Sequence, residues 1–100
     1  MEIIIQFVKM PTSETMETFV TERLEKLEKK YDWIIKADVS YKLENDPTGK
    51  GKICDIRLSL PGPLIFATSD ENSWEAATDA TIRDIEKQLQ KRKASMKTHS

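Results

Sequence analysis

Basic side chains recur at helical spacing in the last third of the chain, and their chemistry suits a phosphate backbone. This row consists of Arg83, Lys87, Lys91, Arg92 and Lys93. Residues 87–100 contain five basic side chains and no acidic one. Such a row is either an ordinary solvated helix face or a nucleic-acid surface, where each neutralised phosphate releases counterions.

A second basic row lies in the first half of the chain, within a segment whose apolar residues also recur at helical spacing. Its members are Arg23, Lys26, Lys29 and Lys30, whereas Glu17, Glu25 and Glu28 fall on the opposite flank. Pairs such as Glu25 and Lys29 could simply stabilise the helix. If both predicted helices cover the same face of a sheet, however, both basic rows point outward from one side of the molecule.

The residues that usually perform catalysis are nearly absent. The one histidine, His99, lies next to the C-terminus, where it cannot be held in a catalytic geometry. Cys54 alternates with apolar residues and is predicted to be a small core residue. The acids Asp70 and Glu71 could bind a cation, but acids before a helix start are the commoner explanation. The sequence therefore predicts no catalytic residue, no metal site, no cofactor and no enzyme.

Composition places the chain among small globular proteins. It has 100 residues, a net charge of −1, 38% apolar residues and one cysteine, which excludes a disulfide framework and a cysteine zinc site. No stretch approaches the roughly 20 apolar residues of a membrane helix, and the N-terminal apolar run is too short for a signal peptide. We expect one cytoplasmic domain over residues 1–93, followed by a flexible tail over 94–100.

Hydrophobic periodicity predicts the elements that position the basic rows. The predicted strands cover residues 2–8, 33–43, 52–60 and 64–68, and the predicted helices cover 13–31 and 74–93. The first strand, apolar without clean alternation, is predicted to be central or partly covered on both faces. Ser13 is the expected cap of the first helix, and residues 69–73 offer caps for the second.

The order β-α-β-β-β-α predicts an α+β fold, a two-layer sandwich with a four-stranded mixed sheet and both helices on one face. Strands one and two should be parallel, because a helix connects them, and the last three strands should form a meander. Five aromatic residues are expected in the core: Phe7, Phe19, Tyr41, Phe66 and Trp74. The outward sheet positions, including Ile53 and Arg57, are mostly polar, so we expect a monomer.

The ordered segments I-I-Q-F-V-K-M, F-V-T-E-R-L-E-K-L-E-K-K-Y, A-D-V-S-Y-K-L, P-G-P-L-I-F-A, A-A-T-D and E-K-Q-L-Q-K-R-K resemble the ribosome hibernation promoting factor family, over residues 2–93. That family also includes the ribosome-associated inhibitor, protein Y and the sigma-54 modulation proteins. The resemblance implies the sandwich described above. It also implies binding to 16S rRNA of the small ribosomal subunit, in the channel for messenger and transfer RNA, and inhibition of translation under stress or in stationary phase.

The resemblance places the rRNA-facing residues of the family close to the two basic rows. They fall at Arg23, Lys26, Lys29 or Lys30, Lys87, Lys91 and Lys93, and Arg92 joins them in the second row. Arg83 departs from the family pattern, and Thr78 replaces its usual isoleucine, which implies a slightly different core. The chain resembles the short form of the family. The rival hypothesis is a protein–protein modulator of a transcription factor, acting through the exposed sheet face or the acidic flank.

Overall fold

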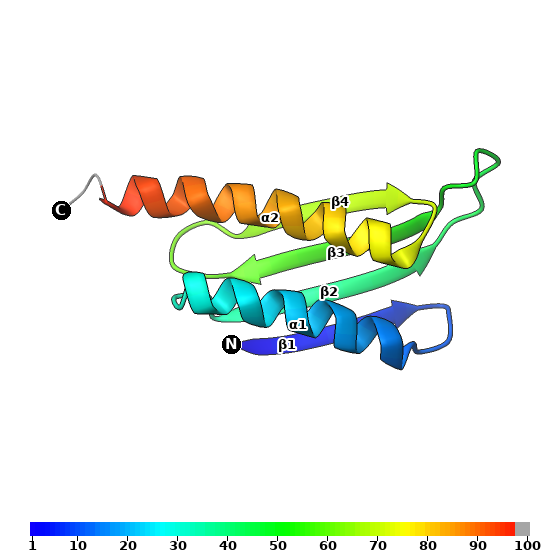
Figure 1. The fold of residues 1–100 in the computed structure, drawn as a ribbon, viewed down its shortest axis with the longest axis horizontal. Coiled ribbons are helices and arrows are strands. Elements are labelled where there is room, and N and C mark those ends of the chain that lie inside the picture. Colours follow the sequence, from blue (N-terminus) through cyan, green and yellow to red (C-terminus); the bar gives the residue numbers. More distant parts are fainter. Residues whose placement is uncertain (98–100) are drawn as a thin grey trace.

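The computed structural model describes residues 1–97, which form a single sheet with two helices across one face (Figure 1). The elements are β1 (Glu2–Val8), α1 (Glu14–Lys30), β2 (Lys36–Leu43), β3 (Lys52–Ser59), β4 (Ile65–Glu71) and α2 (Trp74–Lys97). The predicted order, the α+β class and the placement of both helices on one face are confirmed. The other face of the sheet is turned away from the helices, and we refer to it as the open sheet face.

The four strands follow one another across the sheet in the order β1-β2-β3-β4. β1 pairs with β2 in parallel, while β2 with β3 and β3 with β4 are antiparallel, as predicted. The alternative of a central position for β1 is wrong, because β1 lies at the edge of the sheet. Its run of isoleucines reflects partial burial on both faces: Ile3, Ile4 and Ile5 are all half-buried.

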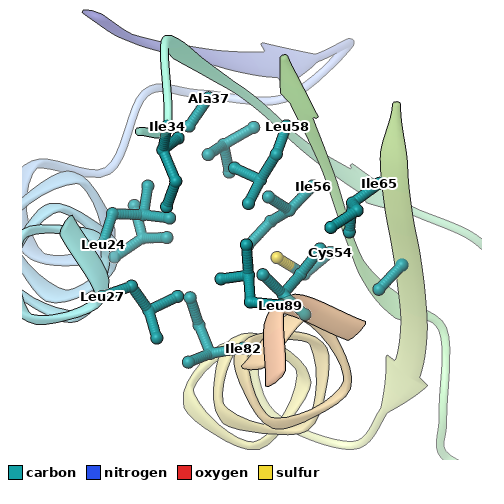
Figure 2. Packing of buried hydrophobic residues seen from close by; sticks show 14 of the residues in the cluster. Leu24, Leu27, Ile34, Ala37, Cys54, Ile56, Leu58, Ile65, Ile82 and Leu89 are labelled. Carbon is teal, nitrogen blue, oxygen red and sulfur yellow. The ribbon is translucent and has the colours of Figure 1, made fainter. Parts of the chain in front are cut away.

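The core lies between the sheet and the helices (Figure 2). The side chains of Leu24, Ile56 and Leu89 are fully shielded from solvent, and Cys54 lies among them as predicted. Burying one such aliphatic side chain contributes about 1.5–3 kcal/mol. Because the helical period of 3.6 and the strand period of two put these residues on facing surfaces, a substitution such as Leu24→Ala would leave a cavity at the centre of the fold.

Two threonines of α2 bring hydroxyl groups into this core, and every one of those groups has a partner. The Thr78 hydroxyl lies 2.7 Å from the Tyr41 hydroxyl and donates to the Trp74 carbonyl oxygen at 2.8 Å. Thr81 donates to the carbonyl oxygen of Cys54 at 3.0 Å. Burial raises the pKa of the Tyr41 hydroxyl well above its ordinary value and that of the Cys54 thiol to about 11. Both groups stay neutral, which suits a structural role.

The helix boundaries follow from their caps. The Ser13 hydroxyl accepts a hydrogen bond from the Met16 N–H at 3.2 Å, as predicted. At the second helix, the Ser73 hydroxyl accepts from the Ala76 N–H at 3.1 Å. Asp70 and Glu71 precede this helix start as expected, but the predicted end of the fourth strand at residue 68 is wrong, because β4 continues through both residues. The Asp70 carboxylate accepts a hydrogen bond from the Gly51 N–H, at 2.6 Å.

α2 is longer than its apolar periodicity predicts, since it continues to Lys97. Residues 94–97, expected in the tail, are therefore helical. The remaining part of that tail, residues 98–100 with His99, lies outside the described residues.

Several apolar residues lie elsewhere than predicted. The alternation of residues 33–43 predicts Ile35 and Leu43 on the same side of the strand as Val39 and Tyr41. Both are nevertheless 61% exposed, because they stand at the two ends of the alternation, where the packed layer stops. Phe66 is 49% exposed, because Ile65 and Ala67 take the positions that face the helices and leave Phe66 on the open sheet face. Ile53, expected to be outward and exposed, belongs to the open sheet face by its register but is only 7% exposed.

Candidate nucleic-acid interface

The two helices run in the same direction, so their C-terminal halves lie at the same end of the molecule (Figure 1). Two ion pairs connect them: Arg23 with Asp79 at 2.7 Å, and Lys30 with Glu86 at 3.1 Å. Both pairs span 56 residues, the constant offset that two parallel helices in register produce. Because both sequences become basic toward their C-terminal ends, this arrangement brings the two basic rows together.

Arg23 and Lys30 each reach across to an acid of α2, although the Lys30 side chain is still 65% exposed. The Arg23 Nε donates to the Asp79 carboxylate, and its guanidinium carbon lies 3.4 Å from the centroid of the Phe19 ring. The Lys30 ammonium group donates to the Glu86 carboxylate. Phe19, expected in the core, is half-buried at this boundary. These two cations therefore join the helices, and their positive charge is largely compensated within the protein.

Arg92 is also bound within the protein. Its two terminal nitrogens donate to the carbonyl oxygens of Pro61 and Pro63, at 2.8 and 2.7 Å. Gly62, between them, has a φ of +92°, and a Cβ there would come within 3.0 Å of the Arg92 Nη1. Glycine at this position lets the turn between β3 and β4 approach α2 closely enough for both hydrogen bonds.

Five lysines remain with their side chains exposed at the C-terminal end of the helix layer, and we call them the basic end: Lys26, Lys29, Lys87, Lys91 and Lys93. Among the side chains that the structure describes, none of these ammonium groups has an acidic partner within ion-pair distance. Lys93 lies 5.7 Å above the centroid of the Tyr31 ring. Arg83 is exposed as well, one to two turns before Lys87 and Lys91.

Acidic residues lie along most of the helix layer, but not in the last turns of α2. Glu14 and Glu17 occupy the first turn of α1, and Glu75 occupies the first turn of α2, where carboxylates stabilise the positive end of each helix dipole. Other acids, such as Glu25 and Glu86, lie close to the first lysines of the basic end. Beyond Glu86, α2 carries basic residues and no acid, so positive charge is concentrated in its last turns.

The structure agrees only in part with the predicted separation of acidic and basic residues onto opposite flanks of α1. Glu17 and Glu25 border a shallow, open surface together with Glu22, and no basic residue lines this surface. Glu28, expected among them, accepts a hydrogen bond from the N-terminal amino group of Met1 and so helps to hold the start of β1. The sequence pattern contained no signal for this contact, because it depends on how β1 is placed beside α1.

Residues 1–97 contain no cluster of three histidine, cysteine or carboxylate side chains able to hold a metal ion. Neither helix in this part has a stretch that is apolar and long enough to span a membrane. The basic end, with five exposed lysines that have no ion-pair partner among the described side chains, is the candidate binding site.

Comparisons with known proteins give a family and a fold. The sequence model of the family described as "Sigma 54 modulation protein / S30EA ribosomal protein" matches residues 3–97. A ribosomal subunit interface protein from Coxiella burnetii is similar in structure, with a TM-score of 0.83 and 23% identity, over 94% of this chain and 99% of that chain. The N-terminal domain of Protein Y from Thermus thermophilus has a TM-score of 0.78 and 22% identity, over 91% and 98%. The search of curated proteins gives no match.

Proposed function

Because the chain belongs to the sigma 54 modulation protein / S30EA ribosomal protein family, we propose that it is a ribosome-associated protein that binds the small ribosomal subunit. The observation that carries this proposal is the basic end, where five exposed lysines from two helices have no acidic partner among the described side chains. Ribosomal RNA is the component of the subunit that such a surface fits, since each lysine can neutralise a phosphate.

The predicted contact residues have two roles in this proposal: some contact RNA, and others position those that do. Lys26, Lys29, Lys87, Lys91 and Lys93 contact 16S rRNA. Arg23, Lys30 and Arg92 hold the two helices and the β3–β4 turn in the arrangement that presents those lysines, because their charged groups are already bound within the protein. Recognition would depend on RNA shape and backbone, since the described part of the helix layer offers no pair of exposed aromatic rings to stack bases.

The biological effect that we propose is non-enzymatic. By occupying the channel through which messenger and transfer RNA pass, the protein would prevent translation in stationary phase or under stress. The protein then acts in the cytoplasm and needs no cofactor. We also propose that it acts as a monomer, since one backbone acceptor at the edge of β4 is already occupied: Gln88 of α2 donates to the Phe66 carbonyl oxygen at 2.9 Å. Analytical ultracentrifugation at micromolar concentration should give a single species of about 11.5 kDa.

The rival function, modulation of a transcription factor through protein contacts, is separated from this one by a sedimentation experiment. Purified 30S subunits, 50S subunits and a sigma-54-type transcription factor are each incubated with the protein. Co-sedimentation with 30S subunits, lost when the five lysines of the basic end are changed to glutamine, supports the proposal. Binding to the transcription factor alone, or to 30S subunits equally well with and without the lysines, would contradict it.

A further inference from the structure

The open sheet face contains a hollow of about 500 Å³. Ile4, Asp38, Arg57 and Phe66 lie side by side across it, one from each strand, because the register places Ile4 opposite Asp38, Asp38 opposite Arg57, and Arg57 opposite Phe66. All four residues line the hollow. This surface is on the far side of the sheet from the basic end, so an inference about it goes beyond the proposed function.

Apolar side chains stand at both rims of the hollow. Phe66 comes from the edge strand β4 and is 49% exposed, whereas Ile4 comes from the opposite edge strand and is half-buried. The fold does not require an aromatic ring at position 66, because the neighbouring Ile65 and Ala67 already supply the core contacts of β4. An exposed ring of this kind offers a large apolar contact area that costs little conformational entropy on binding.

The lysines in and beside the hollow are paired with carboxylates, whereas, in the part of the chain that the structure describes, its arginine is not. Lys36 lies 3.7 Å from the Asp38 carboxylate, and Lys42 lies 3.5 Å from that of Asp55. Arg57 is exposed and, among the described side chains, has no carboxylate within ion-pair distance. The guanidinium group therefore remains available to a ligand, and its planar fork matches a carboxylate with two parallel hydrogen bonds.

We propose that this hollow docks a segment of another protein that presents an apolar side chain next to a carboxylate. The apolar side chain packs against Phe66, and the carboxylate binds Arg57. Aromatic and arginine side chains at the centre of a surface are the residues that contribute most to protein interfaces. A nucleic acid fits less well, because a row of phosphates needs several free cations. Lys36 and Lys42 are already paired with acids, which leaves only Arg57 among the cations described on this face.

The experiment uses a phage-displayed library of random twelve-residue peptides, selected on the full chain and synthesised for binding measurements. The selected peptides should carry an apolar residue within two positions of Asp or Glu. Arg57→Gln and Phe66→Ser should each weaken their binding by about tenfold or more. Both positions are exposed, so the variants should fold, which circular dichroism checks. The matched control, Lys87→Gln with Lys91→Gln, removes charge from the basic end and should leave peptide binding unchanged.

Amide chemical shifts then locate the bound peptide, and they should change on the open face of β2, β3 and β4. The proposal is overturned if no peptide is selected, if the selected peptides lack acids, or if they bind the Arg57→Gln, Phe66→Ser double variant as tightly as the parent. It is also overturned if an oligouridylate shifts the same amides more strongly than the peptide, which would indicate a nucleic-acid surface. A dimer that Phe66→Ser dissociates would instead identify a second copy of the chain as the occupant.

Discussion

The helix layer and the open sheet face both carry many charged residues, but they arrange them in opposite ways. On the helix layer, Lys87, Lys91 and Lys93 follow one another along the last turns of α2 with no acid between them, and the parallel α1 brings its own lysines to the same end. On the open sheet face, oppositely charged side chains lie next to each other, as in the pairs Lys36–Asp38 and Lys42–Asp55. The first surface has a net local charge, whereas the second is close to neutral over a few ångströms.

The arrangement of charges, more than their number, therefore decides what each surface can bind. Like charges that are gathered together create a potential that extends over about a Debye length, roughly 8–10 Å at physiological salt. Alternating charges cancel over the same distance and leave recognition to short-range features, such as an unpaired arginine beside an exposed ring. We therefore expect salt and charge reversal to affect the two surfaces differently.

The largest expected effect is the response of ribosome binding to salt. If about five lysines each neutralise a phosphate, the logarithm of the binding constant should fall by about 4 for each tenfold rise in salt concentration. Binding of a peptide to the open sheet face, which involves one unpaired arginine, should fall by less than about 1. Fluorescence anisotropy across a salt series measures both. A flat response of ribosome binding would mean that the basic end does not contact RNA.

Charge reversal at the basic end should have the next largest effect. Lys87→Glu together with Lys91→Glu should weaken binding to 30S subunits by about 100-fold or more, because two attractive contacts with phosphates become repulsive. Both side chains are exposed, so the free energy of unfolding should change by only about 0.5 kcal/mol at each position. Co-sedimentation measures the first quantity, and urea denaturation measures the second.

The matched control makes the same charge change on the other surface. Lys36→Glu with Lys42→Glu should leave ribosome binding within about threefold of the parent, since neither lysine lies on the helix layer. If this control lost binding while the helix variant kept it, the assignment of the two surfaces would have to be exchanged.

Raising the pH acts on the core, which supports both surfaces. It should therefore lower the free energy of unfolding without a specific effect on binding at either surface. The pKa of the Cys54 thiol is raised to about 11 in the folded protein, whereas an unfolded chain ionises near 8.5. Unfolding therefore releases a proton above pH 8.5, and the free energy of unfolding should fall by about 2 kcal/mol between pH 8 and pH 10. Cys54→Ala, less stable at pH 8, should show a distinctly smaller decline in urea titrations. An equal decline in both proteins would place the cause elsewhere.

The smallest effect is expected on the acidic flank of α1. Glu22→Lys with Glu25→Lys should leave binding to 30S subunits unchanged or tighten it by up to about tenfold, because both residues are exposed and repel phosphates. Glu28 is unsuitable for this test, since its carboxylate binds the N-terminal amino group. A loss of binding in this variant would show that α1 contacts the subunit through its acidic flank.

Local patterns in the sequence are sufficient to predict the elements and their order. The apolar stripe of α1, the alternation around Val39 and Tyr41 and the Ser13 cap each depend on residues a few positions apart, and all are confirmed. Spacing was not sufficient where apolar residues follow one another without alternating with polar ones. It did not place Phe66 on the correct face of the sheet or β1 at its edge. In such runs, sequence spacing is compatible with either orientation.

The sequence shows which residues are basic and that they lie on two helices. Three features depend on the fold: the helices are parallel, Arg23, Lys30 and Arg92 bind groups within the protein, and five other exposed lysines have no ion-pair partner among the described side chains. These two kinds of information differ in the sequence distance between the residues involved. Helical spacing reflects neighbours three or four residues apart, whereas the Arg23–Asp79 pair joins residues 56 positions apart, whose meeting depends on how the whole sheet positions both helices.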